Sequence, residues 1–222
     1  MKKNYILMVD TETAGTIDAP LVFDFGCAVV DQKGRVYETR SLICYEIFYE
    51  HKMEMENCFY QAKLPAYRDE IWDGSRDVRN LLGIKQIVNN LIKKYNIRAV
   101  CAHNAAFDIK ALNNTMNVVT DGAMHYFFPP QVEIWDTLKM ANQICGKMTT
   151  YKNWCNENGY MTKHATPRPR MTAEILYRFI TVNHEFNEAH TGLCDVLIEK
   201  DILAYLISRH KKLDRVLYPA RV

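Results

Sequence analysis

The sequence predicts an α/β fold in which helices flank a mixed five-stranded sheet, within a single domain over residues 1–222. Three apolar runs joined by short turns open the chain, which is typical of an antiparallel meander. Two shorter apolar runs follow, separated by helical patterns, as in parallel strands joined by helical crossovers. With 222 residues, 48% of them hydrophobic and 24% charged, the chain is long and apolar enough to bury one sizeable core.

The first apolar run, Tyr5 to Val9, predicts a buried central strand that ends at two carboxylates, Asp10 and Glu12. Residues i and i+2 of a strand point to the same face, so these two side chains should converge on one point. Like charges held that close raise each other's pKa unless a cation lies between them. Carboxylate oxygens suit Mg²⁺ or Mn²⁺, so the pair predicts a divalent-metal site. On the pair alone, a strand ending in a solvated acidic turn explains the pattern equally well.

The second and third strands are expected at residues 21–30 and 35–45. Residues 31–34 form the turn between them, in which Gly34 supplies a positive φ. Residues 46–76 are rich in Tyr, Met, Glu and Lys and lack the alternation of a strand. We therefore expect a helical or irregular insertion outside the sheet at about 46–76.

The rest of the chain predicts helices that alternate with two short strands. An amphipathic helix with Asp77 as its N-cap should end near Lys94, because its apolar residues recur every three or four positions. The short buried strands are expected at residues 98–102 and 132–135. Further helices should begin within residues 103–108 and span residues 136–144, 149–158, 172–182 and 191–209.

The seven cysteines indicate a reducing compartment, because their number is odd, no C-x-x-C occurs, and several lie in apolar runs. We therefore expect a cytoplasmic protein without a disulfide framework. The apolar run after Lys3 stops at Asp10, too early for a signal peptide, and no apolar stretch approaches the length of a membrane span. The net charge of +2 neither requires nor excludes a nucleic-acid partner.

Asp108, Asp195 and His190 extend the acidic pair into a candidate catalytic site. Asp108 follows the fourth expected strand, at the start of an expected helix. An aspartate at a helix start interacts favourably with the helix dipole in any protein, so this position alone does not indicate a site. Asp195 lies among apolar residues of the last expected helix, where an acid requires a partner. His190 precedes Asp195 by five residues, or about 140° of helix rotation, so the two converge only if His190 lies in the preceding loop. Taken alone, His190 is typical of a surface histidine.

These residues belong to three motifs, namely DTETAG from Asp10, HNAAFD from His103, and His190 followed by Asp195. In this order the motifs resemble the DnaQ-like 3′–5′ exonucleases of the DEDDh type. That family includes polymerase proofreading subunits, RNase T and oligoribonuclease. The WDTL run from Trp135 is similar to the family's Asp-Thr at a strand end. The DEDDy type carries a tyrosine four residues before its last aspartate, where this chain has Thr191, so the DEDDh type is favoured.

The resemblance implies an RNase H-like fold and hydrolysis assisted by two divalent ions, Mg²⁺ or Mn²⁺. It implies that four carboxylates hold these ions, those of Asp10, Glu12, Asp108 and Asp195. It also implies that His190 removes a proton from the attacking water. The expected product is a nucleoside 5′-monophosphate, released from the 3′ end of single-stranded or frayed DNA or RNA.

The substrate should be bound by backbone N–H groups around Thr11 and Thr13, by Asn104, and by Phe107 stacking on a base. A core role suits Phe107 equally well. Two arginines, Arg168 and Arg170, lie in a loop over residues 160–171. This loop would either contact phosphates upstream of the cleaved bond or be a solvated linker.

The chain departs from a compact family member in its long segments 46–97 and 111–131, which leaves substrate choice open. Two other functions stay open as well. One is a non-catalytic nucleic-acid-binding relative, against which the complete set of acids and the histidine argues. The other is a metal-dependent phosphohydrolase that acts on free nucleotides. A polymerase or repair partner is compatible with the expected activity, and the sequence predicts neither the preferred sugar nor the oligomeric state.

Overall fold

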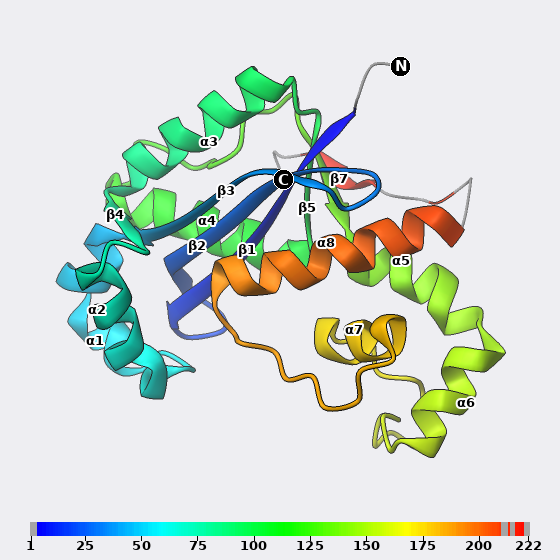
Figure 1. Cartoon of the computed structure of the whole chain (residues 1–222). Coiled ribbons are helices and arrows are strands. Elements are labelled where there is room, and N and C mark those ends of the chain that lie inside the picture. Colours follow the sequence, from blue (N-terminus) through cyan, green and yellow to red (C-terminus); the bar gives the residue numbers. More distant parts are fainter. Residues whose placement is uncertain (1–3, 210–212, 214–215, 220–222) are drawn as a thin grey trace.

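The structure is a computed structural model that describes residues 4–209, 213 and 216–219. Within these residues, seven strands form one mixed sheet in the order β4-β3-β2-β1-β5-β6-β7 (Figure 1). The expected antiparallel meander consists of β1 (Tyr5–Gly15), β2 (Pro20–Asp31) and β3 (Val36–Cys44). β5 (Ala99–Ala102) pairs parallel with β1, and β6 (Glu133–Asp136) pairs parallel with β5. The predicted fold class, a mixed sheet flanked by helices, is therefore confirmed.

The expected number of five strands is wrong, because two short strands extend the sheet at its edges. β4 (Asp77–Arg79) pairs parallel with β3, and β7 (Val216–Pro219) pairs antiparallel with β6. Asp77 is therefore a strand residue and not the expected helix cap. Asn80 caps α3 (Leu81–Tyr95) instead, and its side-chain oxygen accepts a backbone N–H of the first turn at 2.7 Å. β4 lacks the buried apolar run that revealed the almost equally short β5 and β6, because its three residues are exposed or half-buried at the edge of the sheet.

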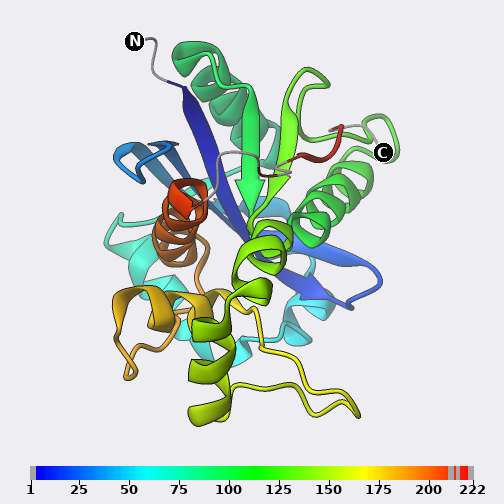
Figure 2. The same cartoon turned by 90° about the vertical axis from the view of Figure 1, so that its right-hand side faces the viewer.

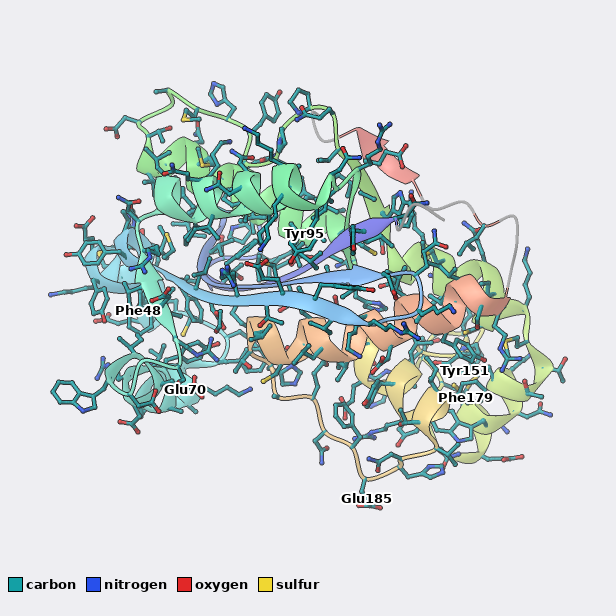
Figure 3. All side chains as sticks on the ribbon, turned by 45° about the horizontal axis from the view of Figure 1, so that its top comes forward. Phe48, Glu70, Tyr95, Tyr151, Phe179 and Glu185 are labelled. Carbon is teal, nitrogen blue, oxygen red and sulfur yellow. The ribbon has the colours of Figure 1, made fainter. Side chains whose placement is uncertain are left out.

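Helices cover both faces of the sheet (Figures 1 and 2). α3 and α4 (Ala105–Val119) pack on one face, and α8 (Gly192–Arg209) crosses the other. On the α8 side, Tyr151 and Phe179 meet edge to face with their centroids 4.9 Å apart (Figure 3). The helices that pack on this side with α8 are α5 (Thr137–Ile144), α6 (Thr149–Glu157) and α7 (Ala173–Thr181).

The alternation of β1 decides which of its polar residues face which helix. Leu7 and Val9 pack in the core beneath α3 and α4, whereas Ile6 and Met8 pack in the core beneath α8. Because side chains alternate along a strand, the even-numbered Asp10 and Glu12 continue the α8 face and Thr11 continues the α4 face.

Asp10 and Glu12 do not lie at the end of the central strand, as the sequence suggested, because β1 continues to Gly15. What ends near Asp10 is the pairing with β5, which covers Ile6–Met8. Beyond Met8, β1 pairs with β2 and its other edge has no β5 partner. This open edge gives the first turn of α4 room to approach Asp10.

Residues 46–76 form short helices at one end of the sheet, beside β1 and β3 (Figure 1). They are η1 (Glu46–Glu50), α1 (Lys52–Glu56), η2 (Gln61–Lys63) and α2 (Leu64–Trp72). The seven cysteines all carry free thiols, and six of them are buried. In the described part of the chain, no helix has both the length and the apolar character needed to cross a membrane.

Candidate active site

Three carboxylates from two distant parts of the chain meet beneath the start of α8. Asp10, Glu12 and Asp195 each offer an oxygen, and these oxygens lie within 4.8 Å of one another. The alternation of β1 turns Asp10 and Glu12 toward α8, and Asp195 stands in the first turn of that helix. The structure thus brings together three of the four carboxylates that the sequence suggested.

Two glycines allow α8 to approach the sheet closely enough for this meeting. A Cβ atom on Gly26 of β2 would lie 2.0 Å from the carbonyl carbon of Gly192, and a Cβ on Gly192 would lie 2.6 Å from the Gly26 nitrogen. Gly26 is the partner of Asp10 in the β1–β2 register. The start of α8 therefore rests directly on the backbone beside Asp10, where no side chain would fit.

The fourth carboxylate, Asp108, approaches from the first turn of α4 and is 4% exposed. The Thr11 hydroxyl donates a hydrogen bond to Asp108 Oδ1 at 2.8 Å. Asp108 lies outside the group of three mutually close carboxylates, although its charge repels that of Asp10. Thr11, which the sequence placed at the substrate through its backbone, thus orients a carboxylate through its side chain.

Burial raises the pKa of every one of these four carboxyl groups. The pKa of Glu12 rises to about 8, and those of Asp108 and Asp195 rise to about 7. The pKa of Asp10 lies well above its usual range, because of burial and then repulsion by Glu199 and Asp108. Such a group favours a proton or a cation, and its all-oxygen donor set fits a hard divalent cation such as Mg²⁺ or Mn²⁺.

His190 lies in the loop that precedes α8, as its convergence with Asp195 required. Its φ of 51° is unusual for a residue with a side chain. The His190 backbone N–H donates to Asp195 Oδ1 at 3.2 Å, and the imidazole stacks on Tyr60 with the ring centroids 4.6 Å apart. Burial, reinforced by the charge of Lys63, lowers the pKa of His190. The imidazole is therefore neutral near pH 7 and able to accept a proton.

A second group of candidate metal ligands overlaps the first at Asp195. Glu188, His190 and Asp195 also offer ligand atoms within 4.8 Å of one another, and His190 Nδ1 lies 3.7 Å from the Glu188 carboxylate. Burial raises the pKa of Glu188 to about 7. A cation bound here would occupy His190, so the two groups imply different roles for this histidine.

Residues of segment 46–76 contact the turn that contains His190. Lys63 donates hydrogen bonds to the backbone carbonyl of Ala189 and, at 3.2 Å, to that of His190. Its ammonium group also lies 4.6 Å from the centre of the Tyr60 ring. Tyr60 and Lys63 therefore fix the conformation in which the imidazole faces the carboxylates.

A buried acid of β2, Asp24, connects the same segment to the start of α8. Its Oδ2 accepts hydrogen bonds from the Gly192 backbone N–H at 3.0 Å and from the Tyr67 hydroxyl at 2.8 Å. Arg76 donates to the same oxygen at 2.8 Å and forms a buried ion pair with it. The position of α8, and with it that of Asp195, thus depends on contacts with residues of segment 46–76.

Arg76→Met is expected to destabilise the protein by about 3–5 kcal/mol, because the fully buried Asp24 carboxylate would lose its partner charge. Urea denaturation would measure this loss. The control is Arg79→Met, since Arg79 pairs with Asp77 at the surface and its loss should cost less than about 1 kcal/mol. Equal losses in the two variants would contradict the proposed importance of the Asp24 ion pair.

The carboxylates form the floor of an open cavity of about 780 Å³. Asn104 and Phe107 line its wall, and Arg168 and Arg170 lie at its rim. The loop that carries the two arginines is held by a β-bridge between Met161 and Pro169 and is therefore no free linker. An acidic floor beneath a basic rim suits a phosphate chain that reaches a bound cation. Thr13, which was also expected to bind substrate, is not among the described residues that line this cavity.

His103, which opens the second motif, has a structural role. Its Nδ1 lies 2.9 Å from Thr137 Oγ1 and its Nε2 lies 2.7 Å from the Met171 carbonyl oxygen, so both ring nitrogens are engaged. Asn104 adopts a left-handed conformation with φ of 67°, and its N–H donates to Asp136 Oδ1 at 3.2 Å. These contacts direct the chain into α4 so that Asp108 faces the cavity.

Sequence reasoning missed several residues of the site. Asp24 had a visible signal, because it is an acid within an apolar strand. Glu199 had one too, since it follows Asp195 by one helical turn among apolar residues. Tyr60 and Lys63 lie in a segment without periodicity, and Glu188 follows no pattern, so nothing in the sequence indicated them.

Comparison with solved structures reveals the same fold in exonuclease I. The structure described as suggesting how exonuclease I achieves processivity has a TM-score of 0.56 at 16% identity, over 94% of this chain and 42% of that chain. E. coli exonuclease I with a dA16 oligonucleotide gives 0.54 at 16% identity, over 94% of this chain and 41% of that chain. Its zinc-bound form with single-stranded DNA gives 0.54 at 14% identity, over 95% of this chain and 42% of that chain.

This chain therefore spans less than half the length of those exonuclease I chains. No protein-family model matches the sequence, and no curated protein sequence does. At these identities the likeness concerns the fold. The chain has the RNase H-like α/β fold of the DnaQ-like 3′–5′ exonucleases.

Proposed function

We propose that this protein is a metal-dependent 3′–5′ exonuclease that removes nucleoside 5′-monophosphates from single-stranded or frayed DNA or RNA. The observation that carries the proposal is the group of three carboxylates, Asp10, Glu12 and Asp195, whose oxygens lie within 4.8 Å of one another on the floor of an open cavity. Such a group is costly unless a cation neutralises it, and hydrolysis of phosphodiesters is a reaction that divalent cations assist.

Asp10, Glu12 and Asp195 would hold a divalent cation, and Asp108 with Asp10 would hold a second. The cations, when bound, would supply Lewis-acid stabilisation of negative charge at the scissile phosphate. His190 would accept the proton of the attacking water, since its neutral imidazole faces the same cavity. Tyr60, stacked on the imidazole, would keep the ring oriented toward that water.

The substrate would enter as a single strand with its 3′ end over the carboxylates. Arg168 and Arg170 at the rim would contact phosphates upstream of the cleaved bond. Phe107, which is half-buried in the cavity wall, would stack on a terminal base, and Asn104 would contact the same nucleotide. This arrangement favours a strand with an unpaired end over a stacked duplex terminus.

Incubation of the protein with Mn²⁺ and a 5′-labelled single-stranded oligonucleotide tests this function, with DNA and RNA compared side by side. A ladder of strands shortened from the 3′ end, with release of nucleoside 5′-monophosphates, is the expected result. An intact strand that is bound but not cut would indicate a nucleic-acid-binding relative. An intact strand together with hydrolysis of free nucleotides would indicate a nucleotide phosphohydrolase.

A further inference from the structure

A mixed nitrogen and oxygen donor set, formed by Glu188, His190 and Asp195, overlaps the all-oxygen carboxylate group at Asp195. Each of its three residues offers one ligand atom, and these atoms lie within 4.8 Å of one another. All three residues line the open cavity, so a cation can reach them from solvent. Exonuclease action as proposed uses His190 and Asp195, whereas Glu188 has no part in it.

The Glu188 carboxylate is largely buried, although no described residue donates a hydrogen bond to it. Its side chain is 13% exposed, and His190 Nδ1 lies 3.7 Å from its Oε2, which is beyond hydrogen-bond distance. Burial of a carboxylate without a donor is costly, so Glu188 favours a proton or a bound cation. This observation concerns burial and is independent of the spacing of the three ligand atoms.

The contacts of His190 leave its ring nitrogens available. Stacking on Tyr60 engages a face of the imidazole, with the two rings 14° from parallel. A metal binds an imidazole nitrogen at the edge of the ring, so this stacking does not compete with a cation. Lys63 holds the turn through the backbone carbonyls of Ala189 and His190, and neither ring nitrogen makes a hydrogen bond to another described residue. The nitrogen lone pair is therefore available to a metal ion as well as to a proton.

These three donors fit Zn²⁺ better than Mg²⁺ or Mn²⁺. Zinc binds imidazole nitrogen and carboxylate oxygen at about 2.0–2.2 Å, and open zinc sites combine three such protein ligands with one water. Two ligands at tetrahedral angles on such an ion lie about 3.4 Å apart. The Nδ1–Oε2 separation of 3.7 Å therefore requires little adjustment. With nitrogen among its donors the site binds Zn²⁺ more tightly than Mn²⁺, whereas carboxylates alone suit Mg²⁺ or Mn²⁺. The two carboxylates outweigh the single positive charge of nearby Lys63.

We propose that Glu188, His190 and Asp195 form an inhibitory zinc site beside the cations that assist cleavage. Zinc binding rests on the donor set itself, whereas inhibition rests on the proposed function. Zn²⁺ bound to the His190 lone pair would prevent the imidazole from accepting the proton of the attacking water. It would also take Asp195 from the group that holds the activating cation. The same cavity would thus be active with Mg²⁺ or Mn²⁺ and inactive once Zn²⁺ is bound.

Glu188→Gln tests zinc binding, because it keeps the shape of the side chain and removes its charge. Calorimetric titration of the full chain with Zn²⁺ should find the tightest wild-type site weakened by about 10–100-fold or more, the range seen when groups that support a metal site are changed. Glu185→Gln is the matched control, since Glu185 lies three residues earlier in the same loop, is exposed and does not line the described cavity (Figure 3). It should bind Zn²⁺ as the wild type does. Both variants should keep the wild-type affinity for Mn²⁺, because neither changes the all-oxygen group.

Oligonucleotide cleavage supported by Mn²⁺ and titrated with Zn²⁺ tests inhibition. Each rate is compared with that of the same protein without Zn²⁺, so a change in basal turnover does not affect the comparison. Half-inhibition of Glu188→Gln should require about 10–100-fold more Zn²⁺ than half-inhibition of the wild type, in line with its lower affinity. Glu185→Gln should be inhibited at the wild-type concentration of Zn²⁺.

Equal Zn²⁺ affinity and equal Zn²⁺ inhibition in Glu188→Gln and the wild type would overturn the zinc site and leave the proposed exonuclease intact. A variant that loses Zn²⁺ affinity and is still inhibited like the wild type would refute inhibition at this site. A wild type that cuts no oligonucleotide with Mn²⁺ would overturn the proposed function, while the Zn²⁺ titration would still decide whether the zinc site exists.

Discussion

Asp10→Asn is expected to abolish cleavage of oligonucleotides while making the metal-free protein more stable. Asp10 belongs to the group of three close carboxylates and is also repelled by Asp108 and Glu199. Loss of its charge would remove the ligand common to both proposed cations. Turnover should fall by about 10²–10³-fold or more, the scale of losing one strong electrostatic stabiliser of a transition state.

The stability gain follows from the direction of the carboxyl pKa shifts. In the folded protein the pKa of Glu12 is raised to about 8 and those of Asp108 and Asp195 to about 7. A carboxyl group with a raised folded pKa contributes stability that is present below its unfolded pKa, near 4, and lost as the pH rises through the folded value. The metal-free wild type should therefore melt at progressively lower temperature between about pH 5 and pH 8.

Thermal melts across this pH range, with and without saturating Mn²⁺, measure both effects. Mn²⁺ should raise the melting temperature of the wild type most at the higher pH, because a ligand that binds only the native state stabilises it. Asp10→Asn should show a shallower pH dependence and little response to Mn²⁺. Asp18→Asn, which changes an exposed acid of the β1–β2 turn, should behave like the wild type. A wild-type melting temperature indifferent to Mn²⁺ would contradict a metal site.

His190→Ala is expected to lose about 10²–10⁴-fold in turnover while it keeps its affinity for Mn²⁺ and for oligonucleotides. The imidazole has a lowered pKa, caused first by burial and then by the charge of Lys63, so it is neutral near pH 7 and can accept a proton. It also lies in the turn that Tyr60 and Lys63 hold from segment 46–76. Removal of the ring should therefore remove the base and leave the carboxylates in place.

The pH–rate profile separates this role from a packing role. The wild type should gain activity as the pH rises through an ionisation below about 6.5, the reference pKa of histidine, and the variant should lack this limb. His125→Ala, a change at an exposed histidine outside the described cavity lining, is the control and should keep the wild-type profile. A fully folded His190→Ala protein with turnover within a few fold of wild type would refute the general-base assignment without affecting the carboxylate group.

The sequence predicted the parts of the fold that repeat a pattern. The alternation of β1 placed Asp10 and Glu12 on one face, and the apolar face of the last helix made Asp195 conspicuous as an acid that needed a partner. Both patterns arise because one face of the element is buried against a neighbouring layer. The spacing of apolar residues in a single sequence shows which face that is. The edge strand β4 carries no such pattern, because Val78 is the one apolar residue among its three, whereas the almost equally short β5 and β6 are largely buried apolar runs.

The contacts that fix the site could not be predicted, because they join segments far apart in the sequence. The Gly26–Gly192 contact depends on how closely α8 approaches β2. The stacking of Tyr60 on His190 likewise depends on the path of segment 46–76, which has no periodicity. Such pairings follow from the packed structure and leave no regular spacing in the chain.

The most direct test of the metal centre is anomalous diffraction at the manganese edge from crystals grown with Mn²⁺ and a nucleoside 5′-monophosphate. We predict a manganese peak held by Asp10, Glu12 and Asp195, with the His190 ring free of metal. The alternative group of Glu188, His190 and Asp195 satisfies the same distance limit and provides the competing position. A peak at that group alone, with His190 as a ligand and none beside Asp10 and Glu12, would contradict the account.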